Sequence, residues 1–282
     1  MSIPAGIVLF NPDIARLTEN LNSIAKSVSC VYIVDNGSSN QTEIRKLLDG
    51  YDNVQLHVNE KNEGIAKALN QLCESAQAEG YQHIITLDQD SVCPVNLVHE
   101  YQKYTSDSSI GLVCPLIQDR NVKFENLEYT EEATEVDHCI TSASMLSLKV
   151  WADVNGFDES MYIDGVDFDF GDRIHKRGKK IIRLNNVVLL HEIGHIRERR
   201  FLFWKTRVKN HSAFRKYYIA RNTVYLARKR RSKLIYIKSY LQVVKQIGMV
   251  LLYEKDKKQK INSIWRGMVN GASAKLEAKW CE

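Results

Sequence analysis

Residues 83–91 read His-Ile-Ile-Thr-Leu-Asp-Gln-Asp-Ser, an apolar run rich in β-branched residues that ends in two aspartates. The run is typical of a buried strand, and Asp88 and Asp90 stand at its carboxyl end, where open α/β sheets bind ligands. Side chains two residues apart in an extended segment point the same way, so these carboxylates repel unless a cation lies between them. Hard oxygen ligands suit Mg²⁺ or Mn²⁺. The stretch therefore predicts a strand end that binds a divalent ion, against the simpler interpretation of a solvated acidic turn.

Strand and helix patterns alternate upstream of this stretch. Short apolar runs at residues 7–10, 31–34 and 54–58 are separated by segments whose apolar residues recur at helical spacing, around residues 14–24, 44–48 and 65–78. Strands that alternate with helices in this way indicate βαβ units and a parallel sheet with right-handed connections. The first hundred residues are therefore expected to form an α/β fold with a parallel sheet. Residues 110–117 and 140–148 also have the pattern of strands.

Polar residues follow each of these predicted strands. Asp35 comes directly after the second strand, where its carboxylate can accept a hydrogen bond from a nucleobase imide or a ribose hydroxyl, or simply cap an Asp-Asn-Gly-Ser turn. Phe10 and Asn11 close the first strand. Asn62 and Gly64 precede a helix whose first backbone amides can approach a ligand, although an ordinary helix cap has the same form.

Four acids lie within nine residues at Asp164, Asp167, Asp169 and Asp172. Asp167 and Asp169 alternate with Val166, Phe168 and Phe170, which we expect to be buried. A carboxylate among apolar neighbours has its pKa shifted toward that of a general base. The alternative is structural, with Asp167 or Asp172 pairing with Arg173 or capping a helix over residues 173–180.

The sequence His191-Glu192-Ile193-Gly194-His195 spells the His-Glu-x-x-His motif of zinc metallopeptidases. That motif requires both histidines on one helix face and a third ligand downstream. Here it follows residues 181–190, whose apolar pattern predicts a pair of strands, and Gly194 weakens a helix. We therefore expect His191 to lie at a strand end, either as a nitrogen ligand to a metal held by carboxylates or as a polar terminus, and keep the metallopeptidase as a distant alternative.

Composition limits the class of protein. The 282 residues are 44% hydrophobic and 26% charged, as in an ordinary globular protein. Six cysteines are scattered without a Cys-x-x-Cys pair, which argues against a zinc ribbon and a disulfide framework. The amino terminus lacks a basic segment of the secretory kind, and no apolar run reaches the ~18 residues that span a bilayer. We therefore expect a cytoplasmic protein.

The last third of the chain is basic and is expected to be helical from about residue 200. Residues 197–233 interleave Lys and Arg with aromatic residues, a pattern that suits nucleic acid, anionic lipid, an anionic substrate or a solvated helix face. Residues 234–253 are apolar but include Lys238 and Lys245, which favours an amphipathic helix on a core or a membrane surface. A nucleic-acid-binding protein would leave the acidic clusters without a purpose, so we expect no nucleic-acid partner.

The ordered set of motifs resembles a family 2 glycosyltransferase of the GT-A fold, closest to the bacterial rhamnosyltransferases that build O-antigens and capsules. The resemblance runs from about residue 7 to residue 222. Its elements are Asp35-Asn-Gly-Ser38, Asn62-x-Gly64-Ile-Ala-x-Ala-Leu-Asn70, Leu87-Asp-Gln-Asp-Ser91, Gly156-Phe-Asp-Glu159, Tyr162-Ile-Asp-x-Val-Asp-Phe-Asp169, Arg173, Gly178, His191-x-x-Gly194 and Tyr217-Tyr-x-x-Arg-Asn222.

This resemblance implies a Rossmann-like nucleotide-binding half with a mixed sheet in residues 1–199, followed by a basic amphipathic helical region in residues 200–282. It implies that Asp35 contacts a pyrimidine and that Asp88 contacts the ribose. The metal, Mg²⁺ or Mn²⁺, would be held by Asp88, Asp90 and His191. The base is implied at Asp167, but Val166 replaces the family's glutamate, so Asp164 remains a second candidate. The full expected donor-binding set is Phe10, Asn11, Asp35, Asn62, Gly64 and Asp88.

The resemblance further implies inverting transfer of L-rhamnose from dTDP-β-L-rhamnose to a hydroxyl of a lipid-linked oligosaccharide at the inner face of the cytoplasmic membrane. The basic stretch at residues 197–233 would then lie near anionic headgroups. The same fold with another donor, a UDP-hexose or UDP-galactofuranose, is the alternative within this class of enzyme.

Overall fold

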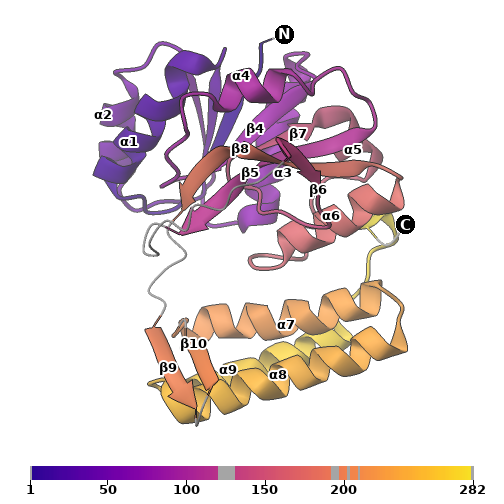
Figure 1. Ribbon diagram of the computed structural model, residues 1–282. Coiled ribbons are helices and arrows are strands. Elements are labelled where there is room, and N and C mark those ends of the chain that lie inside the picture. Colours follow the sequence, from indigo (N-terminus) through magenta and orange to yellow (C-terminus); the bar gives the residue numbers. More distant parts are fainter. Residues whose placement is uncertain (1, 120–130, 192–196, 202–203, 209, 281–282) are drawn as a thin grey trace. The chain divides into compact units, whose positions relative to one another are not determined.

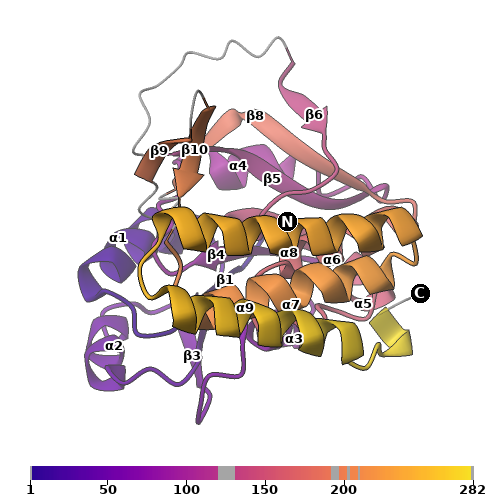
Figure 2. The same cartoon turned by 90° about the horizontal axis from the view of Figure 1, so that it is seen from below.

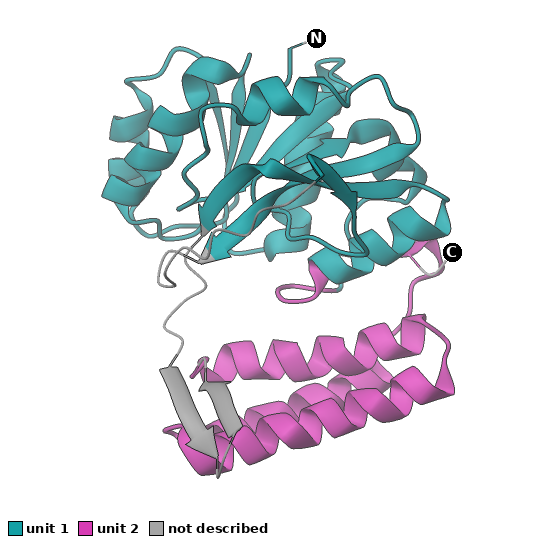
Figure 3. Cartoon of the chain, in the orientation of Figure 1, with its two compact units in different colours: residues 1–160, 167–192 teal, residues 161–166, 193–282 magenta. Residues whose placement is uncertain are grey.

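The computed structural model describes residues 2–119, 131–191, 197–201, 204–208 and 210–280. The chain divides into two compact units (Figure 3). Unit 1 comprises residues 1–160 and 167–192, and unit 2 comprises residues 161–166 and 193–282. The predicted boundary between residues 199 and 200 stays a prediction. The position of the division matters for the site, because it separates the two candidate bases. Asp167 belongs to unit 1 and Asp164 belongs to unit 2.

The described strands of unit 1 form one eight-stranded mixed sheet in the order β3-β2-β1-β4-β7-β5-β8-β6 (Figure 1). Its first four strands are parallel, whereas β7 runs antiparallel to both its neighbours and β6 runs antiparallel to β8. The strands are β1 (Ala5–Leu9), β2 (Val31–Asp35), β3 (Val54–Val58), β4 (His83–Asp88), β5 (Ile110–Asp119), β6 (Ala133–Glu135), β7 (Ser144–Ser147) and β8 (Lys180–His191). The expected mixed sheet of a GT-A fold is confirmed.

Helices cover both faces of the sheet's first half. The inward residues of α1 (Ile14–Ile24), α2 (Gln41–Leu48) and α4 (Leu97–Gln102) share one apolar core with alternate residues of β1 and β2. Helix α3 (Ile65–Ala78) packs on β1, β2 and β4. A helix follows each of β1, β2 and β3 before the next parallel strand, so the carboxyl ends of β1, β2 and β4 meet at one edge.

The second half of unit 1 departs from the predicted pattern in two places. The strand expected at residues 140–148 is the shorter β7, because Ser147 accepts the Val150 N–H through its side chain and begins helix α5 (Leu148–Asp153). The strand pair expected at residues 181–190 is the single strand β8, whose pairing with β5 shifts register between Pro115 and Leu116. In the sequence, a register shift within one long strand and a break between two short strands interrupt the apolar pattern in the same way.

The larger segment of unit 2, residues 193–282, contains an antiparallel strand pair, β9 (Arg197–Phe201) with β10 (Trp204–Val208). The expectation of helix from residue 200 onward is therefore wrong for this strand pair. Three helices follow: α7 (Ala213–Lys229), α8 (Lys233–Tyr253) and α9 (Lys257–Ser273). None of the described helices is long and apolar enough to cross a membrane.

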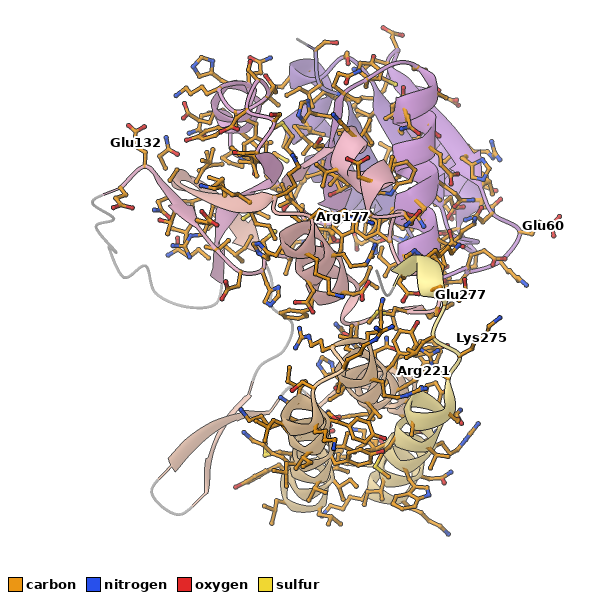
Figure 4. All side chains as sticks on the ribbon, turned by 90° about the vertical axis from the view of Figure 1, so that its right-hand side faces the viewer. Glu60, Glu132, Arg177, Arg221, Lys275 and Glu277 are labelled. Atoms are coloured by element: carbon orange, nitrogen blue, oxygen red, sulfur yellow. The ribbon has the colours of Figure 1, made fainter. Side chains whose placement is uncertain are left out.

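Helices α7 and α9 approach each other closely at two glycines. A Cβ atom at Gly267 would collide with the Tyr217 carbonyl, and one at Gly271 would collide with the carbonyl of Arg221, which Figure 4 labels on α7. The buried carboxylate of Glu254 ties the ends of all three helices together. It accepts from Lys216 Nζ of α7 at 2.6 Å and from Lys260 Nζ of α9 at 3.0 Å.

The segment 161–166 belongs to unit 2 because α7 holds it. Asn222 Nδ2 donates to the carbonyls of Ile163 and Asp164, both at 2.8 Å, and the Tyr162 ring stacks on Tyr218 with centroids 5.0 Å apart. This contact gives a structural role to the Tyr-Tyr-x-x-Arg-Asn motif near the end of the resemblance.

Candidate active site

The register of the parallel strands brings two predicted carboxylates to the same edge of the sheet. Leu9 of β1 pairs with Asp35 of β2, and Val8 of β1 pairs with Asp88 of β4. Asp35 and Asp88 therefore lie on either side of the end of β1. This is the crevice outside the carboxyl ends of parallel strands, the usual place for a ligand in an open α/β sheet.

The Asp35 side chain is buried and half-satisfied. Its Oδ1 accepts from the Ser38 N–H at 3.1 Å and from the Ser38 hydroxyl at 2.5 Å. Its Oδ2 is buried and has no hydrogen-bond partner among the described residues. Leaving a buried acceptor without a donor costs free energy, so such an atom in a native site suggests that a ligand supplies the donor.

Asn36 fixes the loop that precedes α3, a role that the sequence patterns did not reveal. Its Nδ2 donates to Asn62 Oδ1 at 3.0 Å and to the Gly64 carbonyl at 3.2 Å. Its Oδ1 accepts from the Glu63 N–H at 2.9 Å and from Asn59 Nδ2 at 3.1 Å. The predicted residues Asn62 and Gly64 are thereby held beside the end of β2 and next to Asp35.

Phe10 and Asn11 lie at the same edge. Asn11 has a positive φ of 47°, and its Oδ1 accepts from the Ser39 N–H and hydroxyl, both at 2.8 Å. The Phe10 N–H donates to Gln89 Oε1 at 2.9 Å, while its ring is 45% exposed. Gln89 lies between Asp88 and Asp90, so it links the first predicted donor-binding residues to the acidic pair.

Of the three predicted metal ligands, the structure describes the side chains of Asp88 and Asp90. Asp88 ends β4 and is half-buried, and Asp90 follows it in an exposed turn. His191 is the last residue of β8, paired in register with Asp119, and its side chain lies outside the described residues. Among the described residues no group of three or more His, Cys, Asp or Glu side chains forms a metal site.

His191 is the one residue of the His-Glu-x-x-His motif that the structure describes. His191 is part of strand β8, and residues 192–196, including His195, lie outside the described residues. A zinc site of that class requires the two histidines one turn apart on a helix. The strand conformation of His191 therefore argues against the metallopeptidase.

The acidic cluster forms the start of a helix rather than a strand-like alternation. Helix α6 spans Val166–Lys176, so the predicted helix over residues 173–180 begins too late. Val166 and Phe170 are buried as expected, but Phe168 is 51% exposed and that expectation is wrong. Helical spacing, with its period of 3.6 residues, sends Phe168 to a different face from its neighbours. Acids are favoured in this first turn by the helix dipole.

Two of the four acids, Asp169 and Asp164, have different arginine partners. Asp169 is buried and pairs with Arg173 at 2.8 Å, although only Asp167 and Asp172 were predicted as partners for this arginine. Asp164 has a left-handed backbone with a φ of 65°. Its carboxylate accepts hydrogen bonds from the Nε and one terminal nitrogen of Arg215. Arg215 was not among the predicted residues, because its partner lies 51 positions away in sequence.

A pocket of about 310 Å³ opens next to the start of α6. The rings of Phe168 and His138 meet edge to face in its wall, with centroids 5.3 Å apart. Contact with the Cys114 thiol and burial raise the pKa of Cys139, another wall residue, and the negative charge of Asp167 adds to that rise. Asp167 therefore lies within electrostatic reach of the pocket wall. The further lining residues are Pro115, Leu116, Ile117, Val136, Ile140 and Arg183.

Residues 6–167 match the model of the family described as Glycosyl transferase family 2, which is more than half of the chain. The chain belongs to this family. The matched residues contain the whole sheet edge built from β1, β2 and β4 and end at Asp167. The protein is therefore a glycosyltransferase.

Comparisons with individual proteins agree with this family 2 assignment. The chain is 28% identical over 249 residues to the dTDP-rhamnosyl transferase RfbF of Shigella flexneri, covering 83% of this chain and 82% of that protein. Solved structures share the fold at low identity. S. aureus TarS 1–349 in complex with UDP-GlcNAc is 16% identical with a TM-score of 0.64, covering 96% of this chain and 82% of that one. The mannosyltransferase PcManGT from Pyrobaculum calidifontis, in complex with GDP-Man and Mn²⁺, is 13% identical with a TM-score of 0.61, covering 99% and 77%.

Proposed function

We propose that this family 2 glycosyltransferase moves L-rhamnose from dTDP-β-L-rhamnose to a hydroxyl of a lipid-linked oligosaccharide, with inversion at the anomeric carbon. The reaction would serve the synthesis of an O-antigen, capsule or cell-wall polysaccharide. The observation that carries the proposal is the meeting of Asp35 and Asp88 on either side of the end of β1. The similarity to a dTDP-rhamnosyl transferase supports the sugar and the nucleotide.

The nucleoside part of the donor would bind between β1 and β2. Thymine carries one imide N–H flanked by two carbonyls, and the buried Asp35 Oδ2 is an acceptor without a donor. A charge-assisted hydrogen bond between the two would satisfy that atom. Asn62 and Gly64, held by Asn36, would line the same side of the nucleoside, and the exposed Phe10 ring would cover it.

Asp88 and Asp90 have the chemistry of a Mg²⁺ or Mn²⁺ site. Mg²⁺ in such sites is usually held by one or two carboxylates together with substrate phosphates, so a site of two aspartates fits without a third described carboxylate. His191, at the end of β8, would be a further ligand. When bound, the ion would neutralise negative charge on the departing nucleoside diphosphate.

Asp167 would be the general base. Its carboxylate would take the proton of the acceptor hydroxyl while that oxygen attacks the anomeric carbon from the face opposite the leaving group. Asp164 is the weaker candidate, because its carboxylate is already held by the Arg215 guanidinium. The aromatic wall of the neighbouring pocket, Phe168 and His138, offers a surface on which an acceptor sugar could stack.

Thermal stabilisation by nucleotides tests this proposal. A ligand that binds only the folded protein raises its apparent stability, by about 2.7 kcal/mol at a hundredfold excess over Kd. The full chain would be heated with dTDP, UDP, GDP or CMP, each with and without Mn²⁺. The proposal predicts a shift with dTDP that increases with Mn²⁺. A shift with UDP alone would keep the enzyme class but replace rhamnose by a UDP-hexose or UDP-galactofuranose.

A further inference from the structure

Helix α8 has two apolar faces, and one of them is buried against the other described helices of unit 2. Val243 and Val250 point inward and are buried against α7 and α9. On another face, large apolar side chains are between 50% and 71% exposed. These side chains, here called the outer stripe, are Leu234, Ile237, Leu241, Val244, Leu251 and Leu252.

The members of the outer stripe recur along one side of the helix. Successive members from Leu234 to Val244 are three or four residues apart, and Leu251 follows Val244 after two turns. Positions at this spacing fall on one side of a helix. Figure 2 shows α8 beside α9 with α7 behind them, and on α9 Trp265 is 58% exposed and Val269 is 47% exposed. Isolated exposed apolar residues need no explanation, but a stripe of six along one helix indicates an interaction surface.

Charge determines which partner suits this surface. Residues 233–253 contain no Asp or Glu, and their charged residues are Lys233, Lys238 and Lys245, all exposed. A second copy of the chain would bring these lysines against each other, whereas paired helices normally set opposite charges beside the apolar seam. An apolar stripe bordered by lysines is the pattern of a helix that lies in the plane of an anionic membrane surface.

The basic residues of α7 suit this role less well than the sequence suggested. Lys216 and Lys229 are buried, Arg215 pairs with Asp164, and Arg228 donates to the carbonyls of Gly271 and Ala274. We infer that the outer stripe of α8, bordered by its lysines, is the surface through which the enzyme binds an anionic lipid bilayer. The inference deepens the proposed function, because it names the surface that would meet the membrane carrying a lipid-linked acceptor.

Co-sedimentation of the full chain with lipid vesicles tests the inference. We expect binding to vesicles of phosphatidylcholine mixed with phosphatidylglycerol, weaker binding at high salt, and little binding to phosphatidylcholine alone. The double variant Ile237→Gln/Leu241→Gln should lose vesicle binding, because it removes apolar area from the centre of the stripe. The matched control is Val95→Gln, which removes a side chain that is 98% exposed in unit 1 and should bind as wild type does.

A second variant keeps the test valid if the first fails to fold. Lys238→Gln/Lys245→Gln alters only exposed charges, and we expect the partition constant to fall about fivefold for each lysine. Equal binding by wild type and both variants, or no binding by wild type, would overturn the inference. So would a concentration-dependent dimer in light scattering that the apolar variant abolishes, because the partner would then be a second copy.

The nucleotide measurement separates this inference from the proposed function. A full chain that is stabilised by dTDP but ignores anionic vesicles would overturn only the membrane surface. A chain that binds the vesicles but shows no stabilisation by dTDP would overturn only the proposed donor.

Discussion

At the scale of single residues, Asp35 makes the sharpest prediction. Because both Ser38 donors bind Oδ1, an Asp35→Asn amide would keep its oxygen there and present its NH₂ group where Oδ2 now lies. The variant therefore offers a donor to the thymine imide in place of an acceptor. We expect the Kd for dTDP to rise about ten- to a hundredfold, the range for a hydrogen bond to a charged group.

Isothermal titration calorimetry with dTDP and Mn²⁺ measures this change. The matched control is Asp52→Asn, which alters an exposed aspartate after α2 and should leave the Kd as in wild type. An unchanged Kd in Asp35→Asn would mean that Oδ2 does not face the nucleotide.

The choice between the two candidate bases is a second prediction at this scale. We expect Asp167→Asn to lower kcat by about 10²–10⁴ without changing the Kd for dTDP, because only proton removal is lost. Asp164→Asn, which breaks the ion pair with Arg215, should stay close to wild type in kcat. Release of dTDP from dTDP-rhamnose in the presence of lipid-linked glycans measures both. The reverse ranking would assign the base to Asp164.

Which site residues the sequence could predict depends on how local their signals are. Asp35 and Asp88 follow recognisable strands, so parallel pairing alone places them at one edge. The role of Asn36 could not be predicted, because its hydrogen bonds reach residues 23 to 28 positions away. Only its place directly after Asp35, in an Asp-Asn-Gly-Ser turn, hinted that its side chain is near the edge.

At the scale of elements, the turn after α5 makes a prediction about stability. Gly156 and Gly178 have the same φ of 68°, but their surroundings differ. A Cβ atom at Gly156 would lie 2.7 Å from Asn70 Oδ1, whereas a Cβ atom at Gly178 would have no atom within 4 Å. Asn70 Oδ1 cannot easily move, because it accepts from the Phe157 N–H and the Trp151 indole.

Alanine at either position pays the cost of a left-handed backbone, about 1–2 kcal/mol. Gly156→Ala must also displace Asn70, and overpacking of this kind adds about 1–3 kcal/mol. We expect chemical denaturation to show a lower free energy of unfolding for Gly156→Ala than for Gly178→Ala. Equal values in the two variants would contradict the fixed position of Asn70.

The elements differ in how far their sequences specify them. Strands β1 to β4 and helices α1 to α3 have strong periodic patterns, and the predictions for them hold. Helix α6 begins seven residues before the predicted start at residue 173. The acidic segment alternates with apolar residues, and from sequence alone this pattern is as compatible with a strand as with a helix. Strands β9 and β10 could not be predicted, because residues 202–203 between them contain none of the glycine, asparagine or aspartate that marks a two-residue turn.

At the scale of the whole molecule, the chain does not divide at a single point. Residues 161–166 contact α7 in unit 2, while α6 from Asp167 onward belongs to unit 1. No composition change marks this exchange, since it rests on Asn222 and on the stacking of Tyr162 with Tyr218. The resemblance to the family supplied these residues as motifs, and only the structure shows which unit they stabilise.

Transfer of labelled sugar to lipid tests the proposed rhamnosyltransferase activity most directly. Lipid-linked glycans from bacterial membranes would be incubated with the full chain, Mn²⁺ and radiolabelled dTDP-rhamnose, a UDP-hexose or UDP-galactofuranose, and label in the extracted lipid would be counted. We expect label from dTDP-rhamnose only, abolished by a chelator and by Asp167→Asn. Label from a UDP-sugar with none from dTDP-rhamnose, or undiminished transfer by Asp167→Asn, would contradict the proposal.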